Sequence, residues 1–148
     1  MTPENLHTLL RLRRQAVDAA SQEFAACLAL EAAATTALRE QASRIQEQRR
    51  IAEAVTNGDH DVEAFASWYR GARAELDTRI ARHERALAET ARARAAQILA
   101  RTALETVETL QAEAHQAAVA ASLRQEQHES DDAAGQGRIR RSPDKPPV

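Results

Sequence analysis

The chain has little of the material from which a layered enzyme core is built. Only four of its 148 residues are aromatic, and it contains four glycines, four prolines and one cysteine. Few glycines and prolines leave few places where a helix must stop, and few aromatic rings leave little bulk for a compact core. Because Cys27 is alone, no intramolecular disulfide can form within this sequence, which favours a reducing compartment.

Long hydrophobic runs are also missing. No stretch approaches the roughly 20 apolar residues that span a bilayer, and the first residues lack the apolar segment of a signal peptide. We therefore expect no direct membrane insertion. The formal net charge of −2 and the pI near 6.2 argue against nucleic acid as a partner. Between Arg70 and Arg101 eight arginines alternate with four acidic residues, and no aromatic residues lie among them.

Catalytic and ligand motifs are absent as well. The sequence has no glycine-rich phosphate loop and no nucleophile elbow, and its five histidines form no pair at helical i, i+4 spacing. Asp59-His60-Asp61 has the composition of a metal cluster, but a turn with a capping aspartate explains it fully. We expect no catalytic residue, no cofactor and no metal, and hence a protein that is not an enzyme.

The sequence is instead dominated by helix-forming residues. It contains 34 alanines, and 28% of its residues are charged. From Leu6 to Val55, and more weakly from Val62 to Val107, apolar residues recur at alternating spacings of three and four, which is typical of a coiled coil. We predict one helix over about residues 3–55, which begins at Pro3 behind a capping threonine, and a second over about 62–128.

Residues 56–61 form the predicted turn between these helices. Asn57-Gly58 is a strong turn dipeptide, and Asp59 or Asp61 can cap the following helix. Residues that face each other across the resulting antiparallel pair have numbers that sum to about 118. This pairing sets Leu38 opposite Ile80, Phe24 opposite Arg94 with Ala91 and Ile98 nearby, and Leu10 opposite Val107 to Leu110.

The predicted helices differ in length. The N-terminal end of helix 1 lies opposite residue 113 of helix 2. Residues 115–129 of helix 2 therefore extend past helix 1. Residues 130–148 lack a helical stripe, contain prolines and basic residues, and are expected to be a disordered tail. The predicted fold is therefore all-α: a long antiparallel two-helix coiled-coil hairpin over residues 1–129, followed by a disordered C-terminal tail over 130–148.

Three of the four aromatic residues follow the predicted turn closely, at Phe65, Trp68 and Tyr69. In one interpretation Phe65 and Tyr69 share a helix face and close the end of the hairpin against Ile51 and Val55. In the other, at least one ring is exposed for protein binding, because Trp68 is offset by about 100° from Tyr69. Gly71 would leave a gap beside the rings. Both interpretations can hold for different rings.

Two segments resemble the FliJ family of flagellar export proteins, together with its YscO-like relatives of injectisomes. They run from Leu6-His-Thr-Leu9-Leu-Arg-Leu12 to Val17-Asp18-Ala-Ala20, and from Phe65-Ala-Ser-Trp68-Tyr69 to Leu76-Asp-Thr-Arg-Ile80. The resemblance implies a coiled-coil component of the type III export apparatus that acts as an export chaperone and stalk between the export ATPase ring and the export gate.

The resemblance also implies partners and a location. The partners are the export ATPase and its regulator, the export gate membrane protein and substrate chaperones. The protein would be cytoplasmic and peripherally associated with the inner membrane through the apparatus, as a monomer or with weak self-association. The gate would contact Phe65, Trp68, Tyr69, Ala72 and Leu76. The ATPase ring would contact Leu6, Leu9, Leu10, Leu110 and Leu123.

A second hypothesis is a generic coiled-coil adaptor. The apolar stripe of helix 1 is wider than a two-position seam, since Leu9, Leu30 and Ile51 extend it on one side. Such a stripe would allow two chains to dimerise through helix 1.

Overall fold

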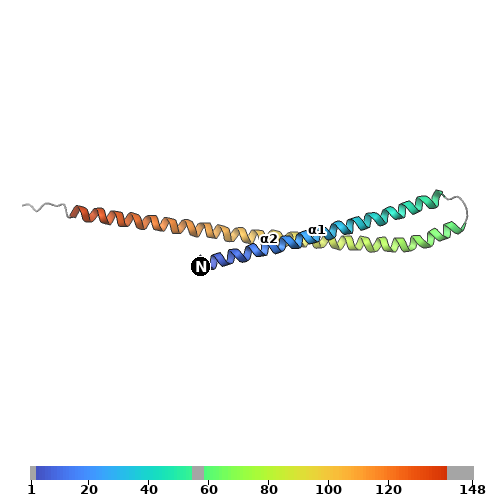
Figure 1. Ribbon diagram of the computed structural model, residues 1–148, viewed down its shortest axis with the longest axis horizontal. Coiled ribbons are helices and arrows are strands. Elements are labelled where there is room, and N and C mark those ends of the chain that lie inside the picture. Colours follow the sequence, from blue (N-terminus) through green and yellow to red (C-terminus); the bar gives the residue numbers. More distant parts are fainter. Residues whose placement is uncertain (1–2, 55–58, 140–148) are drawn as a thin grey trace, which may run out of the picture. The chain divides into compact units, whose positions relative to one another are not determined.

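Two helices make up the part of the chain that the structure describes, residues 3–54 and 59–139. In this computed structural model, α1 spans Pro3–Ala54 and α2 spans Asp59–Ile139 (Figure 1). The described residues contain no strand. The prediction of an all-α helical hairpin is confirmed.

The helix ends differ in part from the predicted ones. Helix α2 already includes Asp59 and extends to Ile139, whereas we expected it to end near residue 128 and a tail to begin at 130. Gly135 and Gly137 cost roughly 1 kcal/mol each relative to alanine, which weakens a helix without stopping it, and the first proline after Glu129 is Pro143. Residues 55–58 and 140–148 lie outside the described residues, and with them the first half of the predicted turn and the rest of the predicted tail.

The chain divides into two units, each of which contains parts of both helices. We call Arg11–Leu104 the central unit, and Met1–Leu10 together with Glu105–Val148 the terminal unit. In the central unit α1 and α2 run antiparallel and lie side by side (Figure 1). Hydrogen bonds between the described residues join them, among them Gln41 to Ala72, Arg79 to Ala37, and Gln97 to Ser21. The residue numbers in these pairs sum to 113, 116 and 118, close to the predicted register.

Among the described residues of the central unit, every buried apolar residue is an alanine. These residues are Ala34, Ala72, Ala86 and Ala93. Small side chains let helix backbones approach closely but bury little apolar area, about 25 cal/mol for each Å². Polar bonds across the seam therefore have a larger part in setting which residues face each other.

The terminal unit contains the larger buried aliphatic residues. Leu10 is only 3% exposed, and Leu6 and Val107 are buried in the same unit. The burial of Leu10 and Val107 agrees with their predicted pairing. Farther along α2, Leu110, Val119 and Leu123 are exposed, so the apolar stripe continues beyond the residues that are covered.

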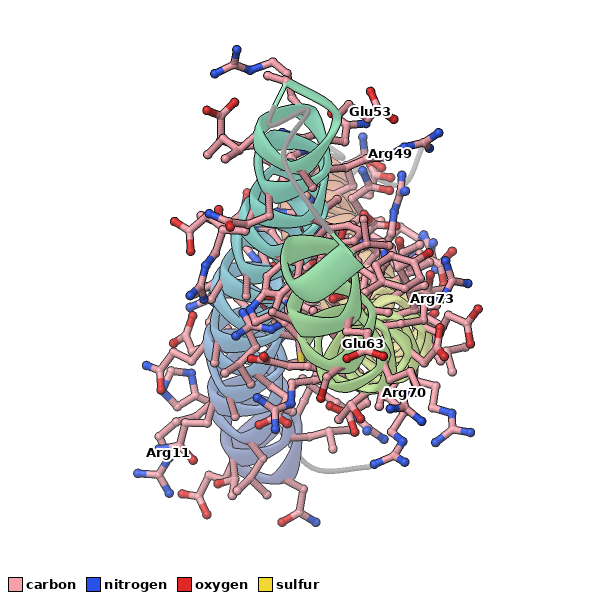
Figure 2. All side chains as sticks on the ribbon, turned by 90° about the vertical axis from the view of Figure 1, so that its right-hand side faces the viewer. Arg11, Arg49, Glu53, Glu63, Arg70 and Arg73 are labelled. Carbon is pink, nitrogen blue, oxygen red and sulfur yellow. The ribbon has the colours of Figure 1, made fainter. Side chains whose placement is uncertain are left out.

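Charged side chains cover the outside of the helices. Figure 2 shows Arg11 and Arg49 on α1 and Glu63, Arg70 and Arg73 on α2 projecting away from the helix axes. Pairs three or four residues apart make ion pairs, such as Arg50–Glu47 at 2.7 Å and Arg73–Asp77 at 3.3 Å. Exposed pairs of this kind contribute little to stability, because water and salt screen them. Neither described helix has a stretch apolar enough to cross a membrane.

Candidate functional site

The three aromatic residues of α2 form one cluster, which we call the aromatic cluster (Phe65, Trp68 and Tyr69). Residues three and four apart on a helix share a face, so Phe65 can contact both of the others. Its ring centroid lies 5.9 Å from that of Trp68 and 5.8 Å from that of Tyr69. Phe65 is half-buried, while Trp68 and Tyr69 are each 37% exposed. Phe65 is thus the inner ring that supports two outer rings, and both outer rings are available for binding.

The structure does not favour the interpretation in which Phe65 and Tyr69 close the end of the hairpin. Ile51, against which Phe65 and Tyr69 were expected to pack, is itself exposed, and Val55 lies outside the described residues. The interpretation with exposed rings therefore describes Trp68 and Tyr69 better.

A surface pocket of about 370 Å³ lies beside the aromatic cluster. Its lining comes from both helices: Gln41, Arg44, Ser67, Trp68, Gly71, Ala72 and Glu75. A Cβ built on Gly71 would meet nothing within 4 Å. The gap that Gly71 was expected to leave beside the rings is therefore present, and the indole of Trp68 forms part of its wall.

The floor of this pocket contains a buried side-chain amide, which the sequence did not predict. Gln41 is only 2% exposed, and its Nε2 donates a hydrogen bond of 3.1 Å to the carbonyl oxygen of Ala72. Its Oε1 is buried and has no hydrogen-bond partner among the described residues. In the sequence Gln41 only interrupts an apolar stripe, and no local signal shows that its amide is buried.

Charged groups form one edge of the pocket. Arg79 Nη1 donates to the carbonyl oxygen of Ala37 at 3.1 Å, and the same guanidinium pairs with the Glu75 carboxylate. The hydrogen bonds from Arg79 hold the pKa of Glu75 below its usual range. The charged residues that line the pocket are Arg44 and Glu75, and Arg79, which is outside the lining, pairs with Glu75.

The residues expected at the gate contact lie together in the central unit, but they are not equally accessible. Ala72 is buried, and its carbonyl oxygen accepts the Gln41 bond. Leu76 is half-buried. Trp68 and Tyr69 are therefore the members of this set that present most side chain to a partner.

All the residues expected at the ATPase ring lie in the terminal unit. Leu6 and Leu10 are buried and Leu9 is half-buried, whereas Leu110 and Leu123 are exposed. The first three hold the unit together, and the last two offer apolar side chains to another protein.

The thiol of Cys27 is half-buried. Partial burial raises its pKa, and the nearby Glu23 and Glu89 carboxylates add to the effect. A raised pKa lowers the fraction of reactive thiolate at neutral pH. No group of three histidine, cysteine or acidic side chains able to hold a metal ion occurs among the described residues.

One comparison with known proteins matches almost the whole chain. The family described as the flagellar FliJ protein matches residues 2–143, which include both helices, the aromatic cluster and the pocket. No curated protein and no solved structure matches the chain.

Proposed function

The chain belongs to the FliJ family of flagellar proteins, and from this premise we propose that it couples the export ATPase ring to the export gate, as an export chaperone and stalk. As a member of this family it is a non-enzymatic, export-related component of the flagellar apparatus. We propose that the protein acts at the cytoplasmic face of the inner membrane, where it is associated with the membrane through the export apparatus. The observation that carries the proposal is the exposed pair Trp68 and Tyr69 on a helix with no other aromatic residue beyond Phe65.

The proposed gate contact is the aromatic cluster with the adjoining pocket. Exposed tryptophan and tyrosine side chains beside a gap are typical of protein-binding hot spots. Phe65 holds both outer rings, so little side-chain entropy is lost when a partner packs against them. Ala72 contributes through its small size and its bond to Gln41, and Leu76 contributes at the edge of the contact.

The proposed ATPase contact lies in the terminal unit. Leu110 and Leu123 are exposed on α2, and Leu6, Leu9 and Leu10 position the end of α1 in the same unit. The ATPase regulator and substrate chaperones are further proposed partners. Two distinct contact surfaces on one chain are what a coupling component requires.

Two pull-downs test this assignment, one with the export ATPase of the same organism and one with the cytoplasmic domain of its export gate. The variant with Trp68→Ala and Tyr69→Ala should lose the gate and keep the ATPase. Leu123→Glu should do the reverse. Failure of the parent chain to retain either partner would contradict the proposal, as would loss of both partners in either variant.

Homodimerisation as a generic adaptor is the second candidate, because Leu30 and Ile51 are exposed on α1. Light scattering separates the two functions. A stable dimer that Leu30→Glu and Ile51→Glu dissociate would favour the adaptor, whereas the coupling function expects a monomer or weak self-association.

A further inference from the structure

The last part of α2 is exposed over a long stretch. In the terminal unit α2 continues past the start of α1 (Figure 1). Residues 111–136 are exposed at every position except Ala120, which is half-buried. Val119 and Leu123 are four apart on one side of the helix, and they are 45% and 54% exposed. No described part of the chain covers this side of α2, which we call the Val119–Leu123 face.

Carboxylates adjoin the Val119–Leu123 face. Glu126 follows Leu123 by three residues and Val119 by seven, so it lies on the same side of the helix. The next acidic residues are Glu129, Asp131 and Asp132, and none of these four carboxylates forms an ion pair with a described residue. Positions 105–136 hold seven acidic residues and a single arginine. The end of α2 therefore carries negative charge that the described residues do not neutralise.

Residues 140–148, which we call the basic segment, have the opposite charge. They contain Arg140, Arg141 and Lys145 against Asp144, and Val148 is their only apolar residue besides the prolines. They follow α2 directly, so they begin next to the acidic residues. The composition of the basic segment thus complements the end of α2, because it offers cations to carboxylates and an apolar side chain to an apolar face.

The length of the basic segment matches the distance to the Val119–Leu123 face. Three of its nine residues are prolines, which lack a backbone donor and favour an extended conformation over a helix. Nine residues in that conformation span about 28 Å, and Leu123 lies sixteen residues before Ile139, about 24 Å along α2. Lys145 is six residues beyond Ile139 and reaches about 19 Å, whereas Glu126 lies about 20 Å back. A reversal after Ile139 would therefore bring Lys145 to Glu126 and Val148 to Leu123.

We propose that the basic segment folds back along α2 and covers the Val119–Leu123 face, with its cations on Glu126 and Glu129. Because the segment is tethered beside this face, its effective concentration there is on the order of millimolar, and a weak contact is sufficient. The same part of α2 from a second copy fits less well, since its carboxylates would repel those of the first. A partner that binds Leu123 must displace the segment, which makes it an autoinhibitory cover. The fold-back itself does not rest on the export function.

Crosslinking of the full-length chain tests the proposal. Lys145 is the only lysine of the sequence, so every carbodiimide crosslink between a lysine and a carboxylate starts in the basic segment. At low salt, mass spectrometry of the crosslinked monomer should find Lys145 joined mainly to Glu126 and Glu129. Glu113 lies 26 residues before Ile139, about 39 Å, and should not be joined within one chain. Salt at about 0.5 M should lower the yield severalfold, because it screens exposed charges.

Matched variants separate docking from reach alone. The variant with Arg140→Gln and Arg141→Gln keeps Lys145, its tether and its target carboxylates, and its crosslink yield should fall severalfold. The same loss of charge by Arg92→Gln and Arg94→Gln in the central unit should leave the yield unchanged.

A second pair of variants tests the apolar part of the contact. Leu123→Ser should lower the yield, whereas Leu99→Ser, at a 70% exposed position of the central unit, should not. Circular dichroism should show that every variant keeps the helical signal of the parent.

Three results would overturn the proposal. The first is an equal yield in the parent and in the variant with Arg140→Gln and Arg141→Gln, which would mean that Lys145 meets the carboxylates by reach alone. The second is a yield that salt does not change. The third is a product that is mainly a crosslinked dimer and increases with protein concentration, which would make a second copy the occupant.

Discussion

Gln41 on α1 donates a 3.1 Å hydrogen bond from Nε2 to the carbonyl oxygen of Ala72 on α2. The amide is buried, and its Oε1 accepts no hydrogen bond from the part of the chain that the structure describes. A half-satisfied buried amide is a poor source of stability, because the unpaired oxygen loses its hydration. It can, however, select one register, as a single polar residue does in other coiled coils. An alanine seam needs such a device, since one alanine packs much like the next.

Replacing Gln41 separates stability from register. Gln41→Leu should leave the free energy of unfolding unchanged or raise it by up to about 1 kcal/mol, because an unsatisfied polar atom is replaced by apolar contact. The distribution of distances between spin labels on α1 and α2 should become broader, because the hydrogen bond from Gln41 to Ala72 no longer selects one register. Urea unfolding and electron-spin resonance measure the two effects. Gln48→Leu, at an exposed position seven residues away, should change neither by much. A loss above about 2 kcal/mol in Gln41→Leu would mean that the bond itself stabilises the hairpin.

Gly71→Ala should stabilise α2 and impair binding at the pocket. An added Cβ meets open space, so the helix gains about 0.5–1 kcal/mol from alanine's higher propensity. The same gain is expected for Gly135→Ala, which also has open space but lines no described pocket. The midpoint temperature of thermal unfolding should therefore rise in both variants. Binding to the export gate should fall in Gly71→Ala alone. Equal gate binding in the two variants would show that the gap is not used.

The Glu75–Arg79 pair makes a small, pH-dependent contribution to stability. Because Arg79 lowers the pKa of Glu75 in the folded chain, this contribution is complete above the unfolded pKa of about 4.3 and is lost as the pH falls through the folded value. Glu75→Gln should thus be less stable than the parent at pH 7, and the difference should disappear in acid. Thermal midpoints measured from neutral to acidic pH give the comparison. In an Arg79→Gln background the pH-dependent effect of Glu75→Gln should become much smaller, because only the weaker attraction of Arg44 then lowers the pKa of Glu75. An undiminished effect there would show that Arg79 is not the main cause.

Phe65→Ala should disturb the outer rings without unfolding the helices. Trp68 is the chain's only tryptophan, so its fluorescence reports on the aromatic cluster alone. Loss of the supporting ring should shift the emission to longer wavelength and weaken gate binding, while the helical signal is kept. Replacing Trp68 and Tyr69 by alanine should also keep helicity, because both rings are 37% exposed. A large fall in helical signal would mean instead that the rings are part of the core.

Much of the architecture follows from local sequence. Apolar spacing of three and four predicts two helices, and Asn57-Gly58 between them predicts the reversal. The pairing that follows brings Phe24 near Ala91, Arg94 and Ile98, which line one groove in the structure. The C-terminal end of α2 was harder to predict, because no proline or capping motif stops the helix between Glu129 and Ile139 and two glycines only weaken it.

The sequence by itself determined the helices and their antiparallel order, because helix propensity, heptad spacing and turn chemistry act between near neighbours. Only the tertiary structure decided which of the polar residues that interrupt the apolar stripe are buried. Gln41 and Gln48 are the same residue seven positions apart, yet only Gln41 is buried. The difference lies across the seam, where Ala72 is small enough to let the Gln41 amide reach a backbone carbonyl. No pattern within α1 contains that information, since it depends on which residue of α2 stands opposite.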